Sequence, residues 1–208
     1  MPINPDAALI AERTSLFKTL QTLTPEEWDT PSLCDGWRVR DVATHVHLLV
    51  TIKPLRVLGG LLMNKGDFNQ FMASYVPQQG KRPTSEILST FESMAGSAQI
   101  PPTTKKVELT FDCFVHHHDI CLPLGREVEA DPERLRWMAD GMVAAKNPIL
   151  SGPRVDGLRL VATDIDWHYG TGPEIHGPAA ALILGGCGRT TLNHLLEGDG
   201  VAELERRS

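Results

Sequence analysis

The sequence lacks several features that would place the protein in a well-known class. It contains four cysteines in 208 residues, and none of them forms a C-x-x-C pair. In a chain of this length, such isolated cysteines indicate reduced thiols in a cytosolic protein rather than a disulfide framework. No G-x-S-x-G, H-E-x-x-H or H-x-x-E-H motif is present, and the glycine-rich run at residues 185–189 has neither the lysine nor the spacing of a P-loop.

An excess of positive charge and a long apolar run are also absent. The formal net charge is -6, and no basic cluster is longer than the pair at residues 105–106. Nucleic acid is therefore excluded as the main partner, because binding it requires clustered Lys and Arg. The most apolar run, residues 46–63, is interrupted by Lys53, Pro54 and Arg56, so no membrane span is expected. With no signal-peptide pattern at the start, the sequence predicts a soluble, cytoplasmic protein, either a monomer or a homodimer.

What is present is the composition of an ordinary globular protein, with 41% hydrophobic and 22% charged residues. The length allows one sizeable core, or one core with a small appendage. Apolar residues recur at helical spacing through the first two thirds of the chain. The expected helices are residues 6–23, a short turn after Thr24, 37–62 with a kink at Pro54, about 68–75, 83–98, 104–121 and 132–145.

The pattern changes after Pro148. Residues 157–163 alternate as in a strand, which residues 164–169 are expected to continue. A turn, a short strand at 174–176, an apolar helix to about residue 187 and a helical tail interrupted at 198–200 complete the chain. The prediction is a mainly α protein, with a four-helix bundle at residues 1–150 and a small C-terminal α/β region at residues 151–208 packed on the bundle.

A carboxylate and an imidazole lie four residues apart within the sequence DCFVHHHD, residues 112–119. On a helix, Asp112 and His116 would share one face, one turn apart. Their oxygen and nitrogen atoms suit a divalent metal such as zinc. The best candidate for a third ligand is His45, and three protein ligands with one open position are typical of a catalytic metal site.

Each of these residues also has a structural interpretation. An Asp-x-x-x-His pair on a helix is more often simply polar surface, and His45 could be a hydrogen-bonded histidine on a partly buried helix. His117 and His118 are rotated by about 100° and 200° from His116, so they are expected to point elsewhere, as is His47 relative to His45. Asp119 is expected to orient a ligating imidazole or to cap the chain near the helix end, although direct ligation is conceivable. The cysteines within and at the end of this helix are expected to be small buried hydrophobes.

Two longer segments carry a resemblance to a known family. LCDGWRVRDVATHV, residues 33–46, resembles the second-helix signature of the DinB-like superfamily, in its mycothiol-dependent maleylpyruvate isomerase branch. DCFVHHHDICLPLGR, residues 112–126, resembles the second signature of that branch, which has Glu at the position of Asp112. Short C-terminal runs, GLRL, DIDW, GPAA and GR, are similar to the terminal region of the branch.

The resemblance implies a helical bundle that binds a divalent metal, usually zinc, through His45, Asp112 and His116. Members of the branch use mycothiol, a low-molecular-weight thiol, as an isomerase cofactor or as the nucleophile of an S-transferase. Because Asp is one methylene shorter than Glu, the helix carrying Asp112 must lie nearer the metal, or the metal is bound more weakly.

These observations favour a metal-dependent transferase in which a metal-activated mycothiol thiolate attacks a small electrophilic substrate. Isomerisation of a maleylpyruvate-type substrate is a narrower alternative, in which thiol addition permits rotation about a former double bond. A metal-dependent hydrolase using water in place of the thiol is a third hypothesis. The fourth is a non-catalytic bundle stabilised by metal, with His117, His118 or Asp119 closing the coordination.

Overall fold

The computed structural model describes residues 3–101, 104–144 and 152–208. They form two compact units, residues 4–128 and residues 129–208. The predicted boundary at residue 150 lies outside the described residues. Helix α8 (Pro132–Ala144), which was expected at the end of the first domain, groups with the C-terminal elements because it packs on α9 (Ala179–Gly186).

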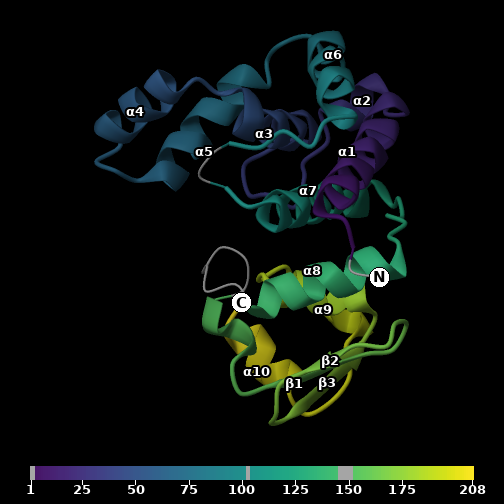
Figure 1. The fold of residues 1–208 in the computed structure, drawn as a ribbon. Coiled ribbons are helices and arrows are strands. Elements are labelled where there is room, and N and C mark those ends of the chain that lie inside the picture. Colours follow the sequence, from purple (N-terminus) through teal and green to yellow (C-terminus); the bar gives the residue numbers. More distant parts are fainter. Residues whose placement is uncertain (1–2, 102–103, 145–151) are drawn as a thin grey trace. The chain divides into compact units, whose positions relative to one another are not determined.

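The first unit is built on a four-helix bundle. Helix α1 packs against α6 and α7, and α3 packs against the same two helices from the other side (Figure 1). Buried apolar side chains such as Leu16, Val42, Phe91 and Ile120 fill the space between them. The helices of this unit are α1 (Pro5–Gln21), α2 (Pro25–Trp28), α3 (Val39–Thr51), α4 (Pro54–Met63), α5 (Phe68–Gln79), α6 (Thr84–Ala95) and α7 (Lys106–Cys121), followed by the 3-10 turn η1 (Leu122–Leu124).

The single kinked helix expected at residues 37–62 is instead two helices, α3 and α4, bent by 116°. Pro54 lacks the N–H that would continue the hydrogen-bond ladder, and it forces the residue before it out of the helical region. Lys53 accordingly has φ -72° and ψ 135°, and Ile52 is extended too. The bend directs α4 away from the bundle toward α5, which packs on both α3 and α4.

The second unit contains a three-stranded sheet in the order β2-β1-β3. Its strands are β1 (Arg159–Ala162), β2 (His168–Tyr169) and β3 (Glu174–Gly177). β1 is antiparallel to β2 and parallel to β3, with Leu160 opposite both Tyr169 and Ile175. Helix α9 packs on β1 and β3, and α8 packs on α9. The remaining elements are the 3-10 helices η2 (Gly152–Val155) and η3 (Thr190–Leu195) and the helix α10 (Val201–Arg206).

The prediction that residues 164–169 continue the first strand is wrong. The chain reverses there, because the Ala162 N–H donates to the Trp167 carbonyl at 2.9 Å. The Asp164 carboxylate accepts the backbone N–H of Ala179 at 2.8 Å and so satisfies a free donor at the start of α9. The predicted fold class, mainly α with a bundle and a small α/β part, is confirmed.

Within the part of the chain that the structure describes, no single helix is long and apolar enough to cross a membrane. Helices α3 and α4 reach that length and hydropathy only as a pair, across their 116° bend.

Candidate metal centre

His45, Asp112 and His116 lie together between α3 and α7. Their potential ligand atoms are all within 4.8 Å of one another. The Nε2 atoms of His45 and His116 lie 3.8 Å and 3.5 Å from the same oxygen, Asp112 Oδ1. Two ligands of a tetrahedral zinc ion are about 3.3 Å apart, given metal–ligand bonds of about 2.0–2.1 Å. The three side chains therefore surround a point that an ion of this size fits.

Helical spacing brings Asp112 and His116 together, and the packing of α3 on α7 brings His45 to them. Asp112 and His116 are separated by one turn of α7, and the His45 ring meets the His116 ring edge-on at a centroid distance of 4.8 Å. The Trp37 ring also packs on His45, at a centroid distance of 5.3 Å. The imidazole of His45 thus has two aromatic neighbours.

Two buried polar atoms in this cluster have no hydrogen-bond partner among the described residues, namely His45 Nδ1 and Asp112 Oδ2. A buried polar atom without a partner is costly, and such atoms commonly mark the place of a water or an ion. A nitrogen, nitrogen and oxygen donor set also suits zinc and similar divalent metals. The residues present therefore fit a divalent metal.

The orientation of His116 is set by Asp119. Its Nδ1–H donates to Asp119 Oδ2 at 2.9 Å, which leaves Nε2 directed at Asp112. A carboxylate behind a ligating imidazole fixes the tautomer and the ring orientation, and it raises the basicity of the ligand. Of the roles considered for Asp119, this hydrogen bond corresponds to the orientation of an imidazole.

In this cluster, His116 and Asp112 shift each other's pKa toward the charged form. Burial alone would lower the pKa of His116, but the Asp112 carboxylate and the hydrogen bond to Asp119 raise it well above its usual range. Burial would likewise raise the pKa of Asp112, but His116 and His45 lower it below its usual range. The site is therefore built to hold a carboxylate beside a positive charge, which a proton or a metal can supply.

The neighbouring histidines point elsewhere, as their helical rotation predicts. His117 Nε2 lies 2.8 Å from Thr19 Oγ1 on α1, and His118 Nδ1 bonds the Phe114 carbonyl at 2.8 Å. Burial lowers the pKa of His117 to about 3. His47 is buried next to the ring of Phe91, and burial lowers its pKa to about 4. Burial lowers the pKa of His118 too, so all three histidines favour the neutral form and lie outside the cluster.

Cys34 is a site neighbour that the sequence analysis did not single out. Its Sγ donates to Asp119 Oδ2 at 3.1 Å and lies 3.6 Å from His116 Nδ1. These two residues and Cys34 form a second group with metal-ligand geometry. Here, however, the candidate atoms hydrogen-bond one another, so the first cluster is the better metal site. No local spacing could have revealed Cys34, because a contact between distant segments, Leu33 N–H to the Asp119 carbonyl, positions it.

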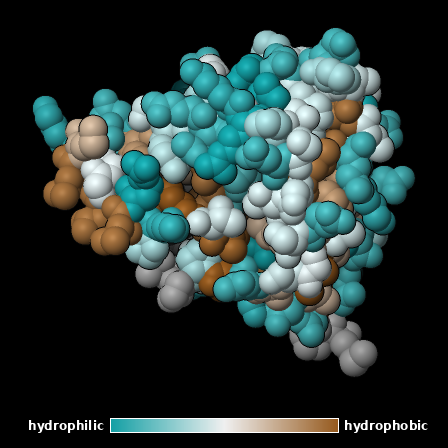
Figure 2. Space-filling view, turned by 90° about the horizontal axis from the view of Figure 1, so that it is seen from above, coloured by the Kyte–Doolittle hydropathy of each residue, from teal (hydrophilic) through white to brown (hydrophobic). Residues whose placement is uncertain are grey.

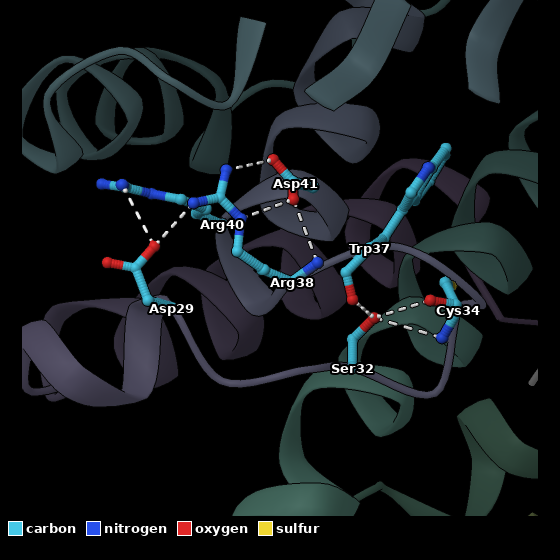
Figure 3. Close-up of polar contacts among 7 residues, drawn as sticks. All are labelled: Asp29, Ser32, Cys34, Trp37, Arg38, Arg40 and Asp41. Atoms are coloured by element: carbon cyan, nitrogen blue, oxygen red, sulfur yellow. Dashed lines mark hydrogen bonds and ion pairs between the residues drawn. The ribbon is translucent and has the colours of Figure 1, made fainter. Parts of the chain in front are cut away.

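Hydrogen bonds also shape the loop that carries Cys34 and Trp37. The Ser32 hydroxyl donates to the Trp37 carbonyl at 2.8 Å and accepts the Cys34 N–H at 3.1 Å (Figure 3). Arg38 then binds the buried Asp41 carboxylate at 2.9 Å, and Asp41 caps α3 by accepting the Arg38 N–H at 3.0 Å. The loop and the start of α3 are thus fixed, so His45 is presented from a well-anchored helix.

Comparison with known proteins supports the family resemblance. Residues 9–55 match the family model of the mycothiol maleylpyruvate isomerase N-terminal domain. That segment includes His45 but ends before Asp112. The resemblance predicted from the sequence is therefore confirmed, and the match itself spans the first part of the chain. No curated protein matches the sequence.

Two solved structures share the fold. One is the mycothiol-dependent maleylpyruvate isomerase, with 13% sequence identity and a TM-score of 0.59. The other is a mutant of a protein of the same description, with 12% identity and a TM-score of 0.61. In both cases the alignment covers 94% of this chain and 91% of the other. At this level of identity, the similarity establishes the fold.

Proposed function

We propose that this protein is a metal-dependent thiol S-transferase that uses mycothiol as its co-substrate and a small electrophile as its second substrate. The observation that carries the proposal is the convergence of His45, Asp112 and His116, in a fold shared with mycothiol-dependent enzymes. Zinc is the best candidate for the metal, because the donors are two imidazoles and one carboxylate.

Three protein ligands would leave a coordination position of the metal open for the thiol. A divalent metal bound by these three residues would supply positive charge that lowers the pKa of a nearby thiol, so that the thiolate is available at neutral pH. Asp119 holds His116 in one tautomer through Nδ1, so that Nε2 stays directed at the site. Trp37 packs against His45 and restricts the movement of its ring. The protein itself then needs to provide no nucleophile, in agreement with the lack of a nucleophile motif.

Cis-trans isomerisation of a maleylpyruvate-type substrate is a second candidate. The family match over residues 9–55 and the names of both structural neighbours favour it. The two reactions begin with the same thiol addition and differ in what leaves the site. A transferase releases the thioether, whereas an isomerase expels the thiol after rotation about the former double bond.

The proposal is tested by titrating mycothiol into cobalt-loaded protein. Entry of the thiol as thiolate should release about one proton per site near pH 7, because a free thiol has a pKa near 8.5. Calorimetry in buffers of different ionisation enthalpy measures that proton, and a sulfur-to-cobalt charge-transfer band reports the contact. Conjugation of an electrophile should then require both metal and thiol. Absence of both signals would overturn the proposal, and metal-dependent turnover without any thiol would favour a hydrolase.

A further inference from the structure

An apolar pocket within the first unit begins one turn of α3 beyond His45, at Leu49. Its volume is about 740 Å³, and side chains of α3, α4 and α5 and of the segment after α6 line it. Small-molecule sites commonly have volumes of about 300–1,000 Å³ and mainly apolar walls. Its lining includes Leu49, Leu58, Leu61 and Ile100, whereas Gln99 and Thr104 are its polar members.

The pocket and the metal cluster share one face of α3. On α3, Leu49 follows His45 by one turn, roughly 6 Å along the axis, and both are half-buried on that face. Thr104, which also lines the pocket, precedes the start of α7, the helix that carries Asp112 and His116. Because one turn of α3 separates the pocket lining from His45, a small organic molecule bound in the pocket can reach the cluster.

The charges along this path disfavour an anionic substrate. The pocket lining contains no Lys or Arg among the described residues. A dicarboxylate such as maleylpyruvate would therefore have no cationic partner in this lining. The cations that follow α3, Lys53 and Arg56, line a different pocket of about 480 Å³, between α4 and α5.

The mouth of the pocket is open. Leu58 and Phe68, which line it, are 55% and 40% exposed. Apolar side chains gather on the surface of the α4 end of the first unit, at the left in Figure 2. Binding at this surface or inside the pocket would remove apolar area of an apolar compound from water, which is favourable.

We infer that the pocket binds the apolar part of a neutral, hydrophobic electrophile and presents its reactive carbon to the thiol at the metal cluster. This inference rests on the proposed function. For an activated alkene, the thiol sulfur forms a bond to one alkene carbon while the π bond opens. The other carbon takes up a proton from solvent, which balances the proton released when the thiol entered as thiolate, so the addition needs no further reactant.

Maleate and its diesters test this selectivity, because they share one reacting double bond. Metal-loaded protein with mycothiol is assayed with maleate, dimethyl maleate and dibutyl maleate, each rate divided by the uncatalysed rate. Either the thioether or the fumarate isomer counts as turnover. The KM should fall at least tenfold from the dimethyl to the dibutyl ester, since burying each extra CH₂ contributes about 0.8 kcal/mol. A preference for the maleate dianion, or a KM independent of chain length, would overturn the inference while leaving the thiol chemistry intact.

Binding to the metal-free protein tests the pocket without catalysis. The neutral fluorescent probe N-phenyl-1-naphthylamine should bind wild-type protein and be displaced by dibutyl maleate. Leu61→Asp should weaken probe binding at least tenfold, because it puts a charge in the pocket lining. Leu62→Asp is the matched control: it is the next residue of α4, is 76% exposed and does not line the pocket.

A second variant shows whether weak probe binding by Leu61→Asp reflects loss of the pocket or misfolding. Leu61→Trp fills the pocket with an apolar side chain and should also reduce probe binding, with the circular dichroism of the wild type. Equal probe affinity in wild type, Leu61→Trp and Leu62→Asp would overturn the pocket assignment. If the probe binds as expected but no maleate derivative is turned over, the proposed transferase function fails and the pocket stands.

Discussion

Three consecutive histidines on α7 have three different environments, and only His116 belongs to the metal cluster. Its Nε2 faces Asp112 and its Nδ1 faces Asp119, so a carboxylate lies at each end of the ring. His117 instead bonds Thr19, and His118 bonds a carbonyl of its own helix. A rotation of about 100° per residue is enough to separate a candidate ligand from two buried structural side chains.

Removing the carboxylate behind His116 should weaken metal binding. In Asp119→Asn the charged acceptor of the Nδ1–H is lost, and zinc affinity should fall roughly 10–100-fold, as measured by competition with a chromogenic chelator. Asp140→Asn is the control, because Asp140 accepts from the Trp167 indole in the other unit and should leave zinc affinity unchanged. Unchanged affinity in Asp119→Asn would show that His116 does not bind metal through Nε2.

The carboxylate at position 112 should tolerate lengthening but not removal. Its Oδ1 already lies 3.5 Å and 3.8 Å from the two imidazole nitrogens, so Asp reaches the site without a shift of α7. Asp112→Glu should keep zinc affinity within about tenfold of wild type, since the longer chain can bend, whereas Asp112→Ala should lose more than 100-fold. Wild-type affinity in Asp112→Ala would remove this residue from the ligand set.

Much of the site at this scale was predictable from the sequence, for a physical reason. Asp112 and His116 share a helix, so their separation follows from spacing alone. His45 could be named only as a candidate, because nothing local indicates which helix packs on α7. Cys34 and the Trp37 ring could not be predicted, since their approach to the cluster depends on how the loop before α3 folds back onto α7.

At the scale of elements, two adjacent glycines of α4 differ in what surrounds them. A Cβ at Gly60 would lie 2.3 Å from the Phe71 ring, whereas a Cβ at Gly59 would meet nothing within 4 Å. Phe71 is buried and stacks on Tyr75, so it has little room to move. The close contact of the two helices therefore requires the absence of a side chain at position 60.

Replacing these two glycines should have opposite effects on stability. Gly60→Ala should lower the free energy of unfolding by about 1–3 kcal/mol through overpacking. Gly59→Ala should raise it by up to about 1 kcal/mol, because alanine favours the helix. Urea unfolding followed by circular dichroism measures both, and equal effects of the two substitutions would contradict the packing described for α4.

Element prediction succeeded where helical periodicity was long and failed where backbone geometry decided. The helices α1, α6, α7 and α8 lie close to their expected bounds. Pro54 does more than kink its helix, because the two residues before it are both extended and a separate helix begins. Residues 164–169 alternate like a strand, yet the chain reverses there so that β2 pairs antiparallel with β1, and no periodicity shows such a reversal.

For the molecule as a whole, the candidate metal centre links two helices that are far apart in the sequence. Bound metal should therefore stabilise the first unit, since a ligand that binds only the folded state adds about 2.7 kcal/mol at 100 times its Kd. Calorimetry should show that zinc raises a Tm of the wild-type protein and that EDTA reverses this increase. In His45→Ala this shift should be largely lost, because α3 no longer contributes a ligand.

The most direct test of the central claim is the zinc content of two adjacent variants. After incubation with zinc and exhaustive dialysis, elemental analysis should find about one zinc ion per chain in wild type and in His117→Ala. His116→Ala should retain little zinc, because it removes a group of the cluster, whereas His117 contacts Thr19 outside it. A wild-type protein without zinc, or equal zinc content in the two variants, would contradict the account.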